Sequence, residues 1–343
     1  MASPIVEGTY SASPYSSRDI DILKEKIFIK LSSDFKTAKF NIEYNIKTDI
    51  DGKQIPLLFY AKDYKDGFKV TIDGKPIELI EIPEDYTKTE GTPFEKFSDS
   101  FIKPDEEGGV EYVKIYWYKN SGYRYYLRDL KYFEVDLSAG EHKILVEYTA
   151  DAWVDRYNWV KEYSIRYSLY PARYWKSFGE LEITIDATEL KSEYKTNLGF
   201  PGTGDINKVG VWKFNAIPED YIVLEYYPPI SGYANFLLTL QPSGMTAIVS
   251  VILILLHLIF IYLYRKKNPA KKFSLAVILG SLVIPLIILW FYVYSFDIID
   301  SAIGNEAGSY HGYTFLSIAL YPFLMPVYLV VMWLIDWMVK KKV

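Results

Sequence analysis

The densest group of residues suited to binding lies between Ala152 and Phe178. Aromatic rings alternate there with arginines, and flat ring faces beside hydrogen-bonding groups suit a sugar ring or a protein hot spot. The alternative is that the rings fill the junction between two β-sandwiches, with the arginines stacked over them. The residues that we single out as a candidate binding set are Trp153, Arg156, Tyr157, Trp159, Arg173, Tyr174 and Trp175.

A second candidate is His257, which lies inside a long apolar segment. An ionisable side chain at bilayer depth is costly and usually faces protein or water. We therefore expect His257 to hydrogen-bond Ser281, a tyrosine of another helix or a partner subunit, and proton transport is the alternative role. His311 has no second histidine nearby and the chain has no cysteine, so we predict no metal site.

The sequence motifs of common enzyme classes are absent. There is no serine hydrolase elbow, P-loop, zinc-binding HExxH or dinucleotide-binding glycine pattern. We therefore predict no cofactor and assign no catalytic residue. A carboxylate pair for glycoside hydrolysis stays open, because such pairs are assembled only in three dimensions.

The C-terminal part of the chain contains three long apolar segments, and His257 lies in the first of them. They cover residues 245–264, 274–295 and 314–337. A helix rises about 1.5 Å per residue, so each segment is long enough to cross the roughly 30 Å of hydrocarbon in a bilayer. The sequence therefore predicts three transmembrane helices.

The loops between these segments differ in charge. Residues 265–273 carry five basic residues and the tail 338–343 carries three, whereas 296–313 carries acidic residues and no lysine or arginine. Basic loops stay cytoplasmic, so we expect 296–313 and the N-terminal region to be extracytoplasmic, periplasmic or extracellular. Near the inner end of the third segment, Asp336 is expected to pair with Lys340, four residues on.

The N-terminal region is acidic. From Gln241 onward the chain has eight basic and four acidic residues, which leaves 30 basic and 39 acidic residues before it. This surplus would repel phosphate, so nucleic acid is excluded as a partner. Export of such a region needs a signal, and the first 40 residues contain no apolar signal core. We expect that a signal peptide has been removed.

Alternating apolar and polar residues predict β-strands in this region, as in Phe40–Ile46, and Asp-Gly dipeptides mark turns between them. Short strands without intervening helices predict a mainly β ectodomain of antiparallel sandwiches. The boundaries that we assign are 1–18 for a flexible arm, 19–150 for a first sandwich with a long loop at 83–110, 151–229 for a second sandwich or a continuation of the first, and 230–244 for a juxtamembrane linker.

Two stretches carry a resemblance to a known group of proteins. FNIEYNIKTDIDGKQIPLLFYAKDYKDGFKVTIDGKPIEL (40–79) and FEVDLSAGEHKILVEYTA (133–150) resemble bacterial envelope membrane proteins with immunoglobulin-like β-sandwich ectodomains. The resemblance covers residues 23–150. It implies an immunoglobulin-like fold and transfers no active site, because that fold hosts many unrelated functions.

Our leading hypothesis is a non-enzymatic membrane protein of the cell envelope. Its ectodomain would bind a protein or an envelope polymer, with a glycan as one candidate, and its helices would dock with other subunits in the lipid bilayer. One alternative is a membrane-anchored enzyme that acts on glycan or lipid. Another is an accessory subunit of a transporter or channel, in which His257, Ser281 and Tyr321 would face a shared wet cavity.

Overall fold

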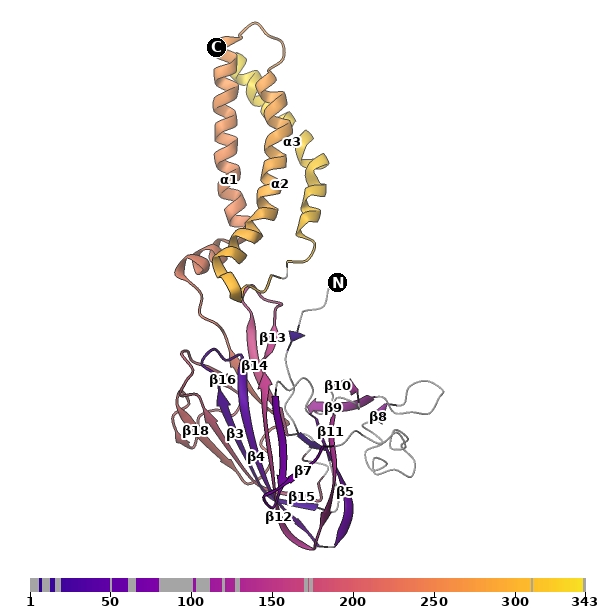
Figure 1. Ribbon diagram of the computed structural model, residues 1–343. Coiled ribbons are helices and arrows are strands. Elements are labelled where there is room, and N and C mark those ends of the chain that lie inside the picture. The colour runs from indigo at the N-terminus through magenta and orange to yellow at the C-terminus, as the bar shows by residue number, and fades with distance from the viewer. Residues whose placement is uncertain are drawn as a thin grey trace. The chain divides into compact units, whose positions relative to one another are not determined.

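The computed structural model divides the chain into two compact units (Figure 1). The β unit comprises Ile5–Asp155 and Glu162–Tyr227, and the helical unit comprises Arg156–Lys161 and Pro228–Val343. The residues that the structure describes are 6–7, 13–15, 20–49, 51–60, 66–79, 101–102, 112–118, 121–126, 130–169, 172, 175–309 and 311–341.

The larger sheet of the β unit is mixed. Its strands β3, β4 and β12 pair antiparallel over almost their whole length, whereas β15 runs parallel to β3. The strands, in order across the sheet, are β17 (Thr203–Gly204), β18 (Val209–Phe214), β15 (Ser177–Asp186), β3 (Ile20–Leu31), β4 (Thr37–Thr48), β12 (Gly140–Asp151), β6 (Asp66–Ile72) and β7 (Lys75–Ile77).

Three smaller sheets complete the described part of the β unit. The first contains β1 (Val6–Glu7), β13 (Trp153–Asp155), β14 (Glu162–Ser168), β19 (Tyr221–Tyr226) and β16 (Lys195–Thr196). The others contain β10 (Ser121–Tyr126), β9 (Tyr112–Tyr118) and β8 (Phe101–Ile102), and β11 (Leu130–Leu137), β5 (Gly52–Tyr60) and β2 (Ser13–Tyr15).

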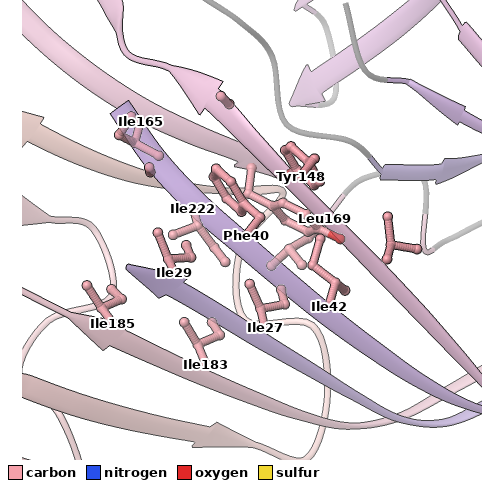
Figure 2. Close-up of a cluster of buried hydrophobic side chains, with 14 of the residues drawn as sticks. Ile27, Ile29, Phe40, Ile42, Tyr148, Ile165, Leu169, Ile183, Ile185 and Ile222 are labelled. Atoms are coloured by element: carbon pink, nitrogen blue, oxygen red, sulfur yellow. The ribbon is translucent and has the colours of Figure 1, made fainter. Parts of the chain in front are cut away.

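One hydrophobic core joins the eight-stranded sheet to the five-stranded sheet. Figure 2 shows Ile27 and Ile29 of β3 and Ile183 of β15 in the same cluster as Ile165 of β14 and Ile222 of β19. Strands on both sides of residue 150 share this core, because β15 and β18 extend the sheet that β3 and β4 begin. Of the range 151–229, residues 151–155 and 162–227 therefore continue the first sandwich, and the remaining residues belong to the helical unit.

Two expectations for the β unit need correction. The sandwich is not antiparallel throughout, since β15 pairs parallel with β3 from Ser177↔Asp21 to Asp186↔Lys30. Alternation of residues determines which face of a strand is buried, but not the direction of its neighbour. The described residues of the expected arm 1–18 form β1 and β2, which pair with β13 and β5. The expected loop 83–110 lies outside the described residues apart from β8.

A β-bulge in β3 determines what enters the core. Ile20 and Ile22 point inward, the register shifts between Ile22 and Lys24, and the buried positions then continue from Glu25. The bulge changes the phase of the alternation, so Glu25 is buried and Lys24 is not. Gly179 of β15 leaves room for it, since a Cβ there would lie 2.2 Å from the Leu23 carbonyl oxygen.

Glu25 is accommodated by two buried tyrosines. The Tyr167 hydroxyl lies 2.9 Å from Glu25 Oε1 and 2.7 Å from the Tyr44 hydroxyl. Burial disfavours the charged carboxylate and raises the pKa of Glu25 from 4.5 to about 7, although the hydrogen bonds from Tyr167 and Tyr44 act in the opposite direction. The core of the β unit therefore contains a carboxyl group that titrates near neutrality.

The helical unit has, within its described residues, three helices whose length and apolar composition allow them to cross a membrane. Two short 3₁₀ segments, η5 (Gly304–Glu306) and η6 (Thr314–Leu320), lie between the second and third helices. The three helices are α1 (Gly232–Lys267), α2 (Leu275–Ile303) and α3 (Tyr321–Lys340), and they pack side by side (Figure 1).

The expected linker 230–244 is largely helical. Ser231 caps α1 by accepting a hydrogen bond from the Ala234 amide at 3.1 Å, and a kink follows at Gln241, where φ is 56° and ψ is 168°. Pro242 comes directly after the kink, at a position where its missing N–H costs no helical hydrogen bond. The Pro and Gly residues of this stretch mark a break between two helical pieces. Composition alone did not distinguish such a break from a non-helical linker.

The buried carboxyl predicts a stability change with pH. Between pH 4.5 and about 7 the folded protein holds a proton that the unfolded chain has released, so the free energy of unfolding decreases as the pH rises through this window. The contribution of Glu25 to this decrease is about 3 kcal/mol. We expect Glu25→Gln to remove it and to be more stable than the parent above the window.

The measurement is the midpoint of thermal unfolding of the whole protein in mild detergent at about pH 5 and about pH 8. Glu180→Gln, on the neighbouring strand with a side chain that is 65% exposed, is the control and should keep the decrease. An unchanged pH dependence in Glu25→Gln would contradict the assignment.

Candidate functional site

A groove of about 430 Å³ lies on the sheet formed by β3, β4, β12 and β6. Most of its polar lining comes from alternate positions of these strands, which point away from the core, and the core residues Phe40 and Tyr148 also border it. The residues that matter for the argument are Phe28, Lys30, Lys39, Asn41, Lys69 and Glu147.

The register of the sheet places these residues in two rows. In the first row, Phe28 lies opposite Asn41, Asn41 opposite Glu147, and Glu147 opposite Lys69. In the second, Lys30 lies directly opposite Lys39. Four strands at a spacing of roughly 5 Å spread the rows over about 15 Å. The groove is therefore a product of strand pairing, in which residues up to 119 positions apart in the chain, such as Phe28 and Glu147, are brought together.

The charges of the groove are unbalanced. Lys30 forms an ion pair with Glu189 at 2.6 Å, and Glu147 lies directly opposite Lys69 in the register, whereas Lys39 has no acidic partner in the part of the chain that the structure describes. Like charges directly opposite each other on a sheet are destabilising, and Glu189 offsets only the Lys30 side of the Lys30–Lys39 pair, so Lys39 favours an anion beside it. Phe28 is 38% exposed and adds an apolar surface. The groove suits a ligand with repeated anionic groups.

Metal coordination has no support in the described residues, where no three His, Asp or Glu side chains lie together as ligands. Glu147 is the one carboxylate among the described residues that line the groove. The groove therefore offers ion pairing and hydrogen bonding.

The aromatic set of the sequence analysis does not form one surface. Trp153 and Trp175 are buried in the β unit, with exposed fractions of 6% and 5%, and the Arg166 guanidinium stacks over the Trp153 ring at 4.0 Å. This is the interior-filling alternative, with an arginine over the ring. Tyr157 is exposed, and Arg173 and Tyr174 lie outside the described residues.

Trp159, together with Arg156 and Tyr157, belongs to the helical unit through the segment Arg156–Lys161. The Trp159 ring lies 5.5 Å from the Phe296 ring and 4.4 Å from the His311 ring, and His311 Nε2 lies 2.8 Å from Asp300 Oδ2. The role of Trp159 in the described structure is thus to pack on the end of α2.

Backbone hydrogen bonds join the segment Arg156–Lys161 to the residues that follow α2. The Lys161 amide donates to the Glu306 carbonyl, and the Gly308 amide donates to the Trp159 carbonyl, both at 2.8 Å. The approach at Gly308 is so close that a Cβ there would lie 1.9 Å from the Asn158 carbonyl oxygen. Only glycine fits at this position.

The buried histidine of α1 has hydrogen-bond partners within the chain for both ring nitrogens. His257 is 2% exposed, its Nε2 lies 3.0 Å from the Ala276 carbonyl and its Nδ1 lies 2.9 Å from the Tyr328 hydroxyl. The carbonyl can only accept, so Nε2 donates to it, and the Tyr328 hydroxyl is the partner of Nδ1. The expected tyrosine partner is present.

Ser281 is not a partner of His257. A Cβ at Gly280 would lie 2.1 Å from His257 Nε2, so the imidazole occupies the space above this glycine. The next residue on a helix points about 100° away, and Ser281 is buried with no hydrogen-bond partner for its hydroxyl among the described residues.

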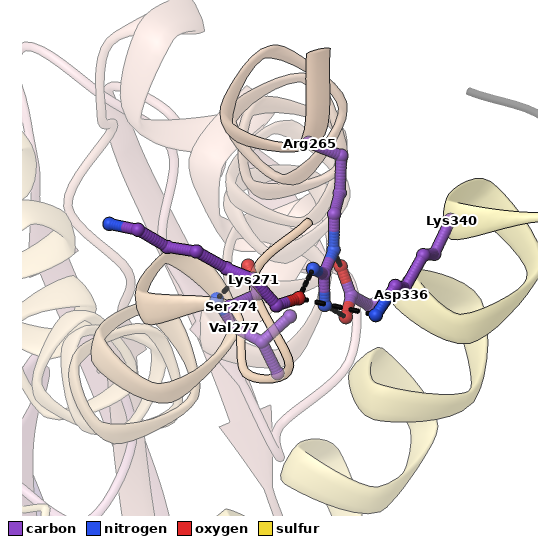
Figure 3. A network of polar contacts seen from close by, with 6 residues as sticks. All are labelled: Arg265, Lys271, Ser274, Val277, Asp336 and Lys340. Atoms are coloured by element: carbon purple, nitrogen blue, oxygen red, sulfur yellow. Dashed lines mark hydrogen bonds and ion pairs between the residues drawn. The ribbon is translucent and has the colours of Figure 1, made fainter. Parts of the chain in front are cut away.

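Asp336 pairs with Arg265, and not with Lys340 as the spacing predicted. Arg265 Nε donates to Asp336 Oδ1 at 2.7 Å, Nη2 donates to Oδ2, and Nη1 donates to the Lys271 carbonyl at 2.7 Å (Figure 3). Both side chains are buried. The planar guanidinium matches a carboxylate with two parallel hydrogen bonds, which a lysine cannot do. Lys340 instead donates to the Lys271 carbonyl at 3.2 Å.

Comparison with known proteins assigns no family. No family model matches the sequence, and no curated protein matches it. The fold is similar to that of a putative nutrient binding protein from Legionella pneumophila, at 13% identity and a TM-score of 0.40, with 64% of this chain and 71% of that chain covered.

Two further structures are similar over a shorter part of their length. The M1 zinc metallopeptidase from Deinococcus radiodurans has 7% identity and a TM-score of 0.29, with 62% of this chain and 43% of that chain covered. Yeast LTA4 hydrolase has 8% identity and a TM-score of 0.29, with 63% and 30% covered. The chain thus spans less than half of each of these two proteins, and similarity at this level assigns no activity.

The buried ion pair leads to a prediction for the helical unit. We expect Asp336→Asn to destabilise the protein by about 3 kcal/mol, because it leaves the Arg265 charge buried without its partner. Lys340→Gln should have little effect, because its side chain is exposed. The measurement is thermal unfolding of the detergent-solubilised protein, and equal losses for the two variants would contradict the Arg265–Asp336 pairing.

Proposed function

We propose that this protein is a membrane-anchored binding protein whose β unit binds an acidic polymer of the cell envelope in the groove across β3, β4, β12 and β6. The observation that carries the proposal is the cluster of Lys30, Lys39 and Lys69 on a region that is otherwise acidic. An immunoglobulin-like relationship of the β unit is part of the same proposal.

The spacing of the lysines favours a polymer over a single small anion. Lys30 and Lys39 are on adjacent strands, roughly 5 Å apart along the hydrogen-bonding direction, and Lys69 is two strands beyond Lys39, roughly 10 Å away. One small anion cannot reach all three ammonium groups. Successive charges on an extended chain can, with Phe28 and Asn41 contacting the backbone between them.

A binding role has more support than the enzymatic alternative. The described lining of the groove contains a single carboxylate, Glu147, so it lacks the convergent pair that glycoside hydrolysis uses. The buried Glu25 faces the core and not a cleft.

The transporter alternative has less support in the helical unit. His257 and Ser281 are buried within the bundle, and Tyr321 donates to the Leu282 carbonyl at 2.8 Å. His257 forms its hydrogen bonds within the chain and gives no support for docking of the helices into a larger assembly, which co-purification of partner subunits would test.

Binding to a polyanion tests the leading proposal. We expect the whole protein in detergent to bind polygalacturonate and not neutral dextran, and Lys39→Gln/Lys69→Gln to weaken that binding about tenfold, since each partly exposed ion pair contributes up to about 1 kcal/mol. Isothermal titration calorimetry at two salt concentrations gives the affinity and its electrostatic share.

A matched control is Lys191→Gln/Lys208→Gln, which removes the same charge from exposed positions outside the groove. It should bind as the parent does. If both double variants lose affinity equally, the attraction is a general effect of net charge and the groove is not the site.

Membrane orientation is a separate prediction, because it rests on the loop charges. The chain has no cysteine, so single cysteines report cleanly. In intact cells we expect a membrane-impermeant thiol reagent to label Ser301→Cys, at the acidic end of α2, and to leave Lys267→Cys unlabelled until the cells are lysed. The reverse pattern would place the β unit in the cytoplasm.

A further inference from the structure

A second groove, of about 270 Å³, lies between the start of α2 and the end of α3. Its walls are apolar and come from both helices. The residues that form them are Phe273, Val277, Ile278, Leu329, Val330 and Trp333.

We propose that this groove binds one acyl chain of an anionic phospholipid, with the phosphate headgroup at Lys272. Lys272, Ser274 and Asp336 form the polar end of the groove, and the apolar walls lead away from it towards the middle of the apolar helices. A phospholipid has the same sequence of parts, a charged headgroup followed by hydrocarbon.

The charge at this end of the helical unit is complementary to an anion. Asp336 would repel one, but Arg265 neutralises it through two hydrogen bonds. Arg265 is itself buried at 2% exposure, so the pair adds no net charge to the surface. The exposed charges that remain near the groove belong to Lys266, Lys267, Lys271, Lys272, Lys340 and Lys341.

No other acidic residue occurs between Arg265 and Lys272 or between Leu329 and Lys341. None of these lysines forms an ion pair with a described residue. A polybasic surface next to a bilayer attracts anionic lipid headgroups, whereas a zwitterionic headgroup gains little from it.

A lipid chain fits the groove better than a partner helix does. The groove opens at Ile278 and Val330, which are 41% and 54% exposed, on a face where apolar side chains would meet hydrocarbon. Membrane helices associate through small residues that allow close approach. The walls here are formed by branched and aromatic side chains, which leave a space for a flexible chain between them.

Quenching of tryptophan fluorescence tests the proposal in nanodiscs that contain the whole protein. Brominated phosphatidylglycerol and brominated phosphatidylcholine are the probes, and the signal of Trp333 is the difference between the parent and Trp333→Phe. We expect the anionic lipid to quench Trp333 at about fivefold lower mole fraction than the zwitterionic lipid, the preference expected from one lysine near the headgroup.

Two variants separate the headgroup from the chain. Lys272→Gln should abolish the preference for the anionic lipid, and Lys266→Gln, which removes the same charge away from the groove, should keep it. Ile278→Phe narrows the groove at an exposed position and should reduce quenching by both lipids. Each variant is compared by helical content and elution volume, so a folding defect is recognised.

Equal quenching of Trp333 by the two lipids would overturn the proposal. So would an equal loss of preference in Lys272→Gln and Lys266→Gln, because the attraction would then be a property of the whole basic end. Trp333 that is quenched by neither lipid would show that another helix or a second copy covers the groove, and this too would overturn it.

Discussion

The β unit depends on the register in which β3 pairs with β4 and β15. Side chains alternate along a strand, so a slip of one residue would exchange the buried and exposed faces of β3. The bulge between Ile22 and Lys24 sets the phase, and from there one face carries Ile27 and Ile29 into the core while the other carries Phe28 and Lys30 to the groove. The same ladder therefore determines both the stability of the sandwich and the composition of its candidate site.

Both units have to compensate for polar groups removed from water, and they do so differently. In the β unit, burial raises the pKa of Glu25 to about 7, so its carboxyl is mostly uncharged below that pH, and Tyr167 donates a hydrogen bond to it. In the helical unit, Arg265 keeps its charge and is paired with Asp336. His257 forms hydrogen bonds at both nitrogens. Each of these groups has a partner on a distant segment of the chain: Tyr167 for Glu25, Asp336 for Arg265 and Tyr328 for His257. These contacts therefore form only when the elements are correctly assembled.

Local patterns predicted much of the fold and little of the candidate site. The alternation in Phe40–Ile46 predicted a strand, and apolar length predicted three helices, because both signals are contained in neighbouring residues. The parallel pairing of β15 with β3, the partner of Asp336 and the separate positions of Trp153 and Trp159 depend on contacts between distant segments. The groove was missed for the same reason: Lys30, Lys39 and Lys69 are ordinary exposed strand residues until the register places them together.

The segment Arg156–Lys161 has a consequence for proteolytic release of the β unit. A protease that cuts near Pro228 leaves Arg156–Lys161, a segment of the helical unit, in the same fragment as the β unit. The segment itself is held by the hydrogen bonds to Glu306 and Gly308 and by the packing of Trp159 on Phe296. Release of the β unit by a single cut is therefore disfavoured, and a fragment that ends at Tyr227 would carry Trp159 into water without its ring partner.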